Sequence, residues 1–157
     1  MRFGVTGHQI LPLRIVDHAV DHWSAIFPAG APLYGVSNLA EGADQLFAAH
    51  VVAVGGVLEA ILPCHGYADS LVTDEGRARL ASLRQAAAKV VTLPFPKPSG
   101  QAFLAAGKAV VERCDHLFAV WDGGPSRGLG GTADIVAYAR ERGRPVTVLW
   151  VDGVLRA

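Results

Sequence analysis

Short apolar runs alternate with longer segments of helical periodicity along the whole chain. Uninterrupted apolar runs predict buried strands, and apolar residues that recur every three or four positions predict helices packed on one face. The predicted strands span residues 2–5, 32–36, 57–63, 89–93, 116–121 and 145–151. The predicted helices span residues 13–27, 43–54, 75–88, 101–114 and 132–143.

The predicted strands are continuously apolar rather than alternating, which is typical of a parallel sheet covered on both faces. Right-handed crossovers then predict an α/β fold, a doubly wound parallel sheet of about six strands with helices on both faces. No repeat, linker or low-complexity tract interrupts the pattern, so we expect residues 1–157 to form a single domain. A ligand of such a fold binds at the carboxyl ends of the strands.

Composition narrows the class of protein. Hydrophobic residues make up 51% of the chain, which suits a packed core, and 14 Lys and Arg residues balance 14 Asp and Glu residues. This neutral balance argues against nucleic acid or an anionic membrane as a partner. Neither a signal-peptide pattern nor an apolar run of membrane-spanning length is present. We therefore expect a cytoplasmic protein.

The segment DGGPSRGLGGTADIV, residues 122–136, lies between the fifth predicted strand and the last predicted helix. Glycines are costly to order, so such a cluster favours close backbone approach to a ligand. A helix N-terminus offers unpaired amides and a partial positive charge to an anion. The residues predicted to hold a phosphate or another anion here are Gly123, Arg127, Gly128, Gly130, Gly131 and Thr132. The alternative is a surface loop whose glycines only form turns.

Two further loops end strands at the same edge of the predicted sheet. The candidate ligand-binding residues are Gly7 and His8 after the first strand, Ser37, Asn38, Gly42 and Asp44 after the second, and Asp122 after the fifth. The acidic residues Glu41 and Asp44 suit ribose hydroxyls or an amine better than a phosphate. The alternative for this second loop is an ordinary helix cap whose acidic residues complement the helix dipole.

The motifs VTGH, LAEGAD and WDG…GGTADIVAYAR together resemble the SLOG superfamily. This group of Rossmann-like nucleotide-binding domains includes the Lonely Guy phosphoribohydrolases and the DNA-processing protein DprA. The resemblance implies that Gly130, Gly131 and Thr132 hold a nucleotide phosphate and that Gly42 and Asp44 lie beside the ribose or the phosphate. It also implies a homodimer or a higher homo-oligomer.

One position departs from the enzymes of that superfamily. Their motif P-G-G-x-G-T-x-x-E ends in a catalytic glutamate, and the matching position here is Ile135. We therefore predict a domain that binds or senses a nucleotide or a nucleotide-derived phosphoribosyl compound, with no further cofactor and no metal. The alternative is an N-glycosidic hydrolase of nucleoside monophosphates that uses Asp134 or Glu41. A scaffold protein whose loop binds nothing is a third interpretation.

Overall fold

The computed structural model describes residues 1–157 and contains one sheet of six parallel strands. The strands are β1 (Arg2–Gly7), β2 (Tyr34–Ser37), β3 (Val57–Leu62), β4 (Lys89–Thr92), β5 (His116–Val120) and β6 (Val146–Leu149). Their order in the sheet is β4-β3-β2-β1-β5-β6. The predicted doubly wound, Rossmann-like α/β fold is confirmed.

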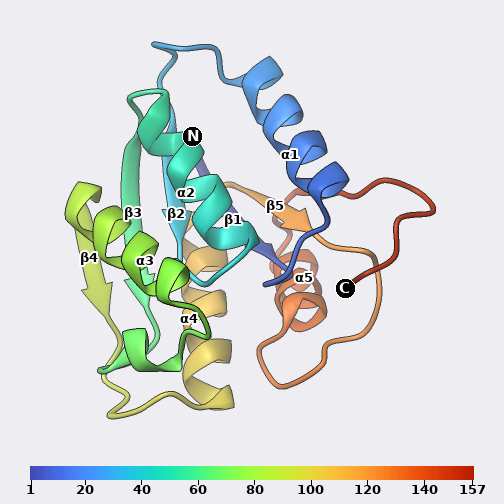
Figure 1. Ribbon diagram of the computed structural model, residues 1–157. Coiled ribbons are helices and arrows are strands. Elements are labelled where there is room, and N and C mark those ends of the chain that lie inside the picture. The colour runs from blue at the N-terminus through green and yellow to red at the C-terminus, as the bar shows by residue number, and fades with distance from the viewer.

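Helices cover both faces of the sheet (Figure 1). The helices are α1 (Leu13–Ile26), α2 (Ala43–Ala53), α3 (Asp74–Ala86), α4 (Gly100–Arg113) and α5 (Thr132–Glu141), with a short 3-10 helix, η1, at Tyr67–Ser70. The first three helices lie on one face, and α4 and α5 lie on the other. None of the helices is both long and apolar enough to cross a lipid bilayer.

The strand order reverses between β1 and β5. From β1 the chain builds outward through β2, β3 and β4, and it then returns to place β5 and β6 on the opposite side of β1. Gly7 pairs with Val120, so the two central strands end at the same level. Loops that leave two such strands in opposite directions open a crevice, and this is where doubly wound folds bind ligands.

Each helical layer packs through its own core. On one face the rings of Trp23, Phe47 and Phe118 interlock, with ring centroids 5.1 Å apart for Trp23 and Phe47 and 5.6 Å apart for Phe47 and Phe118. On the other face, a Cβ atom at Gly107 would lie 2.3 Å from Cδ1 of Ile135. Glycine at this position therefore lets the side chain of Ile135 pack directly against the backbone of α4.

The structure differs from the predicted elements in detail. The apolar spacing in α1 predicts a buried face of Val16, Ala19, Val20, Trp23 and Phe27. Ala19, Trp23 and Phe27 are buried, whereas Ile15 is buried and Val16 and Val20 are only half-buried. Between β3 and α3, where no element was predicted, the chain forms η1, and α3 begins at Asp74, one residue before the predicted start. Both differences arise because tertiary packing decides which side of a helix is covered and where a turn tightens.

Candidate functional site

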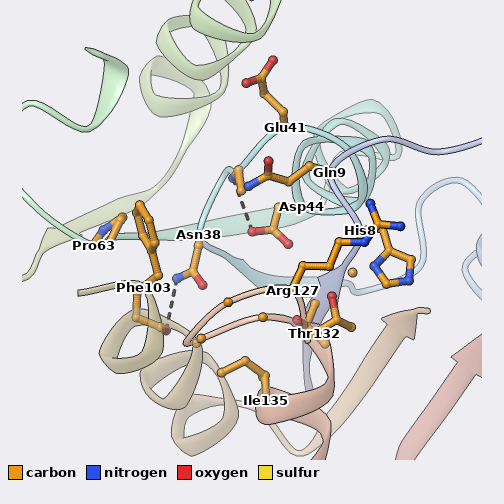
Figure 2. A pocket seen from close by; sticks show the side chains of 18 of the residues that line it. His8, Gln9, Asn38, Glu41, Asp44, Pro63, Phe103, Arg127, Thr132 and Ile135 are labelled. Carbon is orange, nitrogen blue, oxygen red and sulfur yellow. Dashed lines mark hydrogen bonds between the residues drawn. The ribbon is translucent and has the colours of Figure 1, made fainter. Parts of the chain in front are cut away.

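A cavity of about 410 Å³ opens at the carboxyl ends of the strands, at the crevice between β1 and β5 (Figure 2). Its walls come from the loops after β1, β2, β3 and β5, from α4, from the start of α5 and from the segment after β6. This volume lies within the range of small-molecule sites. The cavity therefore joins segments from both ends of the chain.

The β1–α1 loop brings His8 to the centre of the crevice. A Cβ atom at Gly7 would lie 2.4 Å from Cβ of Ala43 and 2.7 Å from the carbonyl oxygen of Val120, so a glycine is needed where α2 and β5 converge. His8 is 3% exposed, and its Nε2 lies 3.0 Å from Oδ1 of Asp122. This contact spans the two strands at the point of reversal.

The other ring nitrogen of His8, Nδ1, is buried and has no hydrogen-bond partner. Burial lowers the pKa of His8, and the hydrogen bond with Asp122 offsets only part of that effect. His8 is therefore neutral near pH 7 in the free protein. A buried polar atom without a partner is uncommon, so Nδ1 is available to a ligand atom or a proton.

The β2–α2 loop is held by its own polar side chains. Oγ of Ser37 donates to the carbonyl oxygen of Asp44 and accepts from the amide of Leu39, whose φ of 58° is unusual for a residue other than glycine. Gly42 has a φ of 81° and packs against the backbone carbonyl oxygens of His8 and Gln9. Ser37 and Gly42 therefore shape this loop and do not line the cavity.

Asn38, from the β2–α2 loop, and Asp44, from the first turn of α2, present acceptors to the cavity (Figure 2). Nδ2 of Asn38 donates to the carbonyl oxygens of Ile61 and Ala106, at 2.8 and 3.1 Å. Both donors of this amide are thus used, and Oδ1 is left to accept from a ligand. Asp44 is 7% exposed, and the amide of Ala40 donates to its carboxylate at 3.3 Å.

No cation neutralises Asp44. Burial raises the pKa of its carboxyl to about 7, because the hydrogen bond from Ala40 compensates only part of the lost hydration. A carboxyl with this pKa exists in both protonation states near neutral pH. It therefore accepts hydrogen bonds from ligand hydroxyl or amino groups and disfavours an anion beside it.

Glu41 lies on the rim of the cavity, but its carboxylate is used within the protein. It accepts hydrogen bonds from Oγ1 of Thr73 at 2.6 Å and from the amide of Val72 at 2.5 Å. Burial raises the pKa of Glu41, but these hydrogen bonds outweigh burial and leave the pKa below its usual value. Glu41 therefore ties the β2–α2 loop to the start of α3.

The glycine-rich loop, residues 122–131, bends over the start of α4. Gly130 has a φ of 81°, and a Cβ atom there would lie 2.6 Å from the backbone nitrogen of Leu104. Its amide donates to Oδ2 of Asp134 at 3.0 Å, and the amide of Asp134 donates to Oγ of Ser126 at 3.1 Å. Asp134 therefore fastens the loop to α5 and does not line the cavity.

The start of α5 retains free donors. The amides of Thr132 and Ala133 donate to no acceptor in the protein, and Thr132 lines the cavity. Ile135 also lines it and is 2% exposed. Ile135 occupies the position at which the Lonely Guy motif has its catalytic glutamate, so an apolar side chain faces the cavity there.

Two arginines line the same region. Arg127 extends toward His8 in Figure 2, and its Nη1 donates to the carbonyl oxygen of Ala157 at 3.1 Å. Arg156, from the segment after β6, donates to the carbonyl oxygen of Pro125 at 3.4 Å. None of the ion pairs in the structure involves either arginine. Each guanidinium group therefore keeps N–H donors for a ligand, while the charge of Arg156 also helps to lower the pKa of Asp122.

An apolar wall completes the cavity on the side of β3 and α4. It consists of Pro63, Tyr67, Leu71 and Phe103. Phe103 is 36% exposed despite its size, so its ring offers a surface to a flat ligand group. No local motif marks Phe103 or Arg156 as a site residue, because Phe103 belongs to an amphipathic helix and Arg156 follows the last strand.

Most of the predicted site residues meet at this cavity. Those that line it are Gly7, His8, Asn38, Glu41, Asp44, Arg127, Gly128, Gly130, Gly131 and Thr132. Those that do not are Ser37, Gly42, Asp122, Gly123 and Asp134. The members of the second group adjoin the first, and all but the exposed Gly123 fix the position of a lining residue or of the loop that carries it. No group of His, Cys, Asp and Glu side chains is arranged to hold a metal ion.

Solved structures of other proteins have a similar fold. DNA processing protein A (DprA) from Streptococcus pneumoniae superimposes with a TM-score of 0.70 and 18% identity over 94% of this chain and 49% of that chain. DprA from Helicobacter pylori gives a TM-score of 0.71 and 15% identity over 94% of this chain and 64% of that chain. The present chain thus spans about half to two thirds of the DprA chains it matches.

A molybdenum cofactor binding protein from Rippkaea orientalis has the same fold. It gives a TM-score of 0.59 and 17% identity over 94% of this chain and 74% of that chain. No protein-family model matches the sequence, and no curated protein matches it. The chain shares with these proteins a Rossmann-like fold, as its sequence predicted, and at these identities the similarity concerns the fold alone.

The comparison corrects one prediction. The balanced charge of the chain argued against a nucleic-acid partner, yet the structure of DprA from Helicobacter pylori is described by its single-stranded DNA binding mode. That prediction is wrong, because net charge averages over the whole surface. A binding site needs only a local group of cations, and the cavity here holds two arginines.

Proposed function

We propose that the chain binds a nucleotide or a nucleotide-derived phosphoribosyl compound in the cavity between β1 and β5. The observation that carries this proposal is the division of the cavity into two chemically different ends. Free amides and arginines gather at one end, and acceptors and an apolar wall gather at the other. A phosphorylated sugar joined to a flat base has the same division of charge.

The phosphate end is formed by the glycine-rich loop and α5. The free amides of Thr132 and Ala133 point out of a helix N-terminus, where the helix dipole favours an anion. Arg127 lies beside them and forms no ion pair with an acidic side chain. Together these groups provide directed donors and positive charge for phosphate oxygens.

The sugar and the base fit the other end. The free oxygen of Asn38 and the carboxyl of Asp44 are acceptors, so they suit the hydroxyl groups of a ribose. The ring of Phe103 and the neighbouring Tyr67 suit the face of a base. The carboxyl of Asp44 makes this end of the cavity unfavourable for the phosphate, which sets the orientation of the ligand.

Binding without breakdown is better supported than N-glycosidic hydrolysis. Ile135 stands where the related motif has its glutamate, and it has no titratable group. The carboxylates of Glu41 and Asp134 are both engaged by amide donors of the protein. Neither is free to stabilise a ribosyl cation in this conformation.

Calorimetric titration with the four nucleoside 5′-monophosphates tests the proposal. We expect at least one to bind, and Arg127→Gln to weaken its binding by about 10- to 100-fold, as the loss of a charged hydrogen bond to phosphate does. Arg140→Gln, an equal change of charge on exposed α5 surface, is the matched control and should bind as the wild type does. Each sample is then analysed for released base.

Two results would count against the proposal. If none of the four compounds binds at millimolar concentration, the cavity is not a nucleotide site. If Arg127→Gln and Arg140→Gln weaken binding equally, the ligand does not use the glycine-rich loop. Released base would instead make the chain a hydrolase.

A further inference from the structure

We propose that the cavity recognises a vicinal diol through Asn38 and Asp44, and that it therefore binds a ribonucleotide in preference to the corresponding deoxyribonucleotide. The inference rests on the proposed function, because it concerns the sugar end of the same cavity. It specifies the sugar of the ligand and gives each of the two ribose hydroxyl groups an acceptor in the protein.

The side-chain amide of Asn38 is fixed in one orientation. Its Nδ2 lies 2.8 Å from the carbonyl oxygen of Ile61, on β3, and 3.1 Å from that of Ala106, on α4. Carbonyl oxygens only accept hydrogen bonds, so the nitrogen of the amide must face them, and both of its N–H groups are used. Oδ1 is left without a donor from the protein, and Asn38 lines the cavity. Two elements thus hold this acceptor ready for a ligand.

The carboxyl group of Asp44 is a second acceptor whose hydrogen bonding the protein leaves incomplete. Asp44 is 7% exposed and lines the cavity. Its carboxyl group has one hydrogen bond, from the amide of Ala40 to Oδ2 at 3.3 Å, and it takes part in no ion pair. Burial of a carboxyl group with so few donors is costly, so a ligand that donates to it relieves that cost.

The two acceptors share one part of the cavity (Figure 2). The amide that bonds to Asp44 belongs to Ala40, which is close to Asn38 in the same loop. The oxygen of Asn38 and an ionised carboxylate have no hydrogen to give each other, so each needs its own donor. A vicinal diol supplies two donors on adjacent carbon atoms. A deoxyribose supplies only one and leaves a buried acceptor without a donor.

Tyr67 favours hydroxyl groups over an amine at this end. Its side chain is almost entirely buried and lines the cavity, and its hydroxyl group has no hydrogen-bond partner in the protein. Burial and then the charge of Asp44 raise the pKa of Tyr67, so the two groups belong to the same end of the cavity. A ligand hydroxyl can donate to Asp44 and accept from Tyr67, whereas an ammonium group has no lone pair to accept with.

Calorimetry with three sugar forms of one nucleotide tests the inference. The probes are the ribonucleoside 5′-monophosphate that binds the wild type most tightly and its 2′-deoxy and 3′-deoxy analogues. The titrations are made at pH 8, above the pKa of about 7 of Asp44, so that its carboxylate only accepts. We expect the wild type to bind each analogue about tenfold more weakly or worse, because a buried acceptor then loses its donor.

Asp44→Ala removes one of the two acceptors. It should reduce the preference for the ribonucleotide over at least one analogue to about threefold or less. Asp17→Ala, the same change on the exposed surface of α1, is the matched control and should keep both preferences. Melting temperatures of the variants check that folding is intact, and the wild-type comparison of the three probes does not depend on either variant.

The outcomes separate this inference from the proposed function. A wild type that binds either analogue as tightly as the ribonucleotide overturns the inference and leaves nucleotide binding intact. A folded Asp44→Ala variant that keeps both preferences in full also overturns it. Binding of deoxyribonucleotides alone has the same meaning. Failure of both kinds of monophosphate to bind overturns the proposed function as well.

Discussion

Asp44 shows how one side chain can link the cavity to the stability of the fold. It is buried with a single hydrogen bond and no cation, so the protein holds it close to the balance between its two protonation states. An unfolded chain would ionise it with a pKa near 3.8. Between that value and about 7, the folded protein retains a proton that the unfolded chain has released.

The substitution Asp44→Asn should remove this pH dependence. As the pH rises from 5 to 8, the free energy of unfolding of the wild type falls, because Asp44 ionises more easily in the unfolded chain than in the folded protein. We expect the stability of Asp44→Asn relative to the wild type to increase by about 2 to 3 kcal/mol over this interval. Urea unfolding of both proteins at the two pH values measures it. A difference that stays constant with pH would mean that Asp44 titrates normally.

The join between the glycine-rich loop and α5 shows how an element prepares a binding site. Asp134 accepts from the amide of Gly130 and donates its own amide to Ser126. A carboxylate in the first turn also complements the helix dipole. These contacts leave the amides of Thr132 and Ala133 pointing outward, so the free donors at the start of α5 depend on an anchored loop.

Asp134→Ala tests this role at the level of the element. Loss of the acceptor for Gly130 should lower the free energy of unfolding by about 1 kcal/mol. It should also weaken binding of the nucleoside monophosphate, since the loop becomes less ordered. Asp134→Asn keeps an acceptor oxygen and should behave nearly as the wild type in chemical denaturation and calorimetry. If the asparagine variant instead binds normally but abolishes a measured release of base, Asp134 is catalytic.

At the scale of the whole molecule, the cavity lies where segments distant in sequence meet. Residues from β1, the glycine-rich loop and the segment after β6 are held together only in the folded chain. The unfolded chain offers no such arrangement. A ligand of this cavity therefore binds the folded state alone and raises the stability of the entire sheet and its helices.

Thermal unfolding measures this coupling. A nucleoside monophosphate at 100 times its dissociation constant should add about 2.7 kcal/mol. For a chain of this size, that gain corresponds to a rise in melting temperature of about 5 to 10 °C. The free nucleoside, which lacks the phosphate, should give a smaller rise at the same concentration. The absence of any rise under conditions that saturate the site in calorimetry would place the binding outside the folded cavity.

The sequence by itself determined the types of element and their order. Apolar runs, helical periodicity and glycine clusters are local features, and each acts on the few residues around it. The parallel sheet followed from continuously apolar strands, and the position of the cavity followed from the ends of those strands. Gly7, His8 and the glycine-rich loop could therefore be assigned to one region before any distance was known.

Only the tertiary structure decided which polar groups face the cavity. Asn38 and Ser37 are neighbours in the same loop, yet hydrogen bonds to Ile61 and Ala106 turn the first toward the cavity, and a bond to Asp44 holds the second within the loop. Arg156 joins the site because its segment folds back onto a loop about 30 residues earlier in the chain. Such choices depend on contacts between distant segments, which no local pattern of residues encodes.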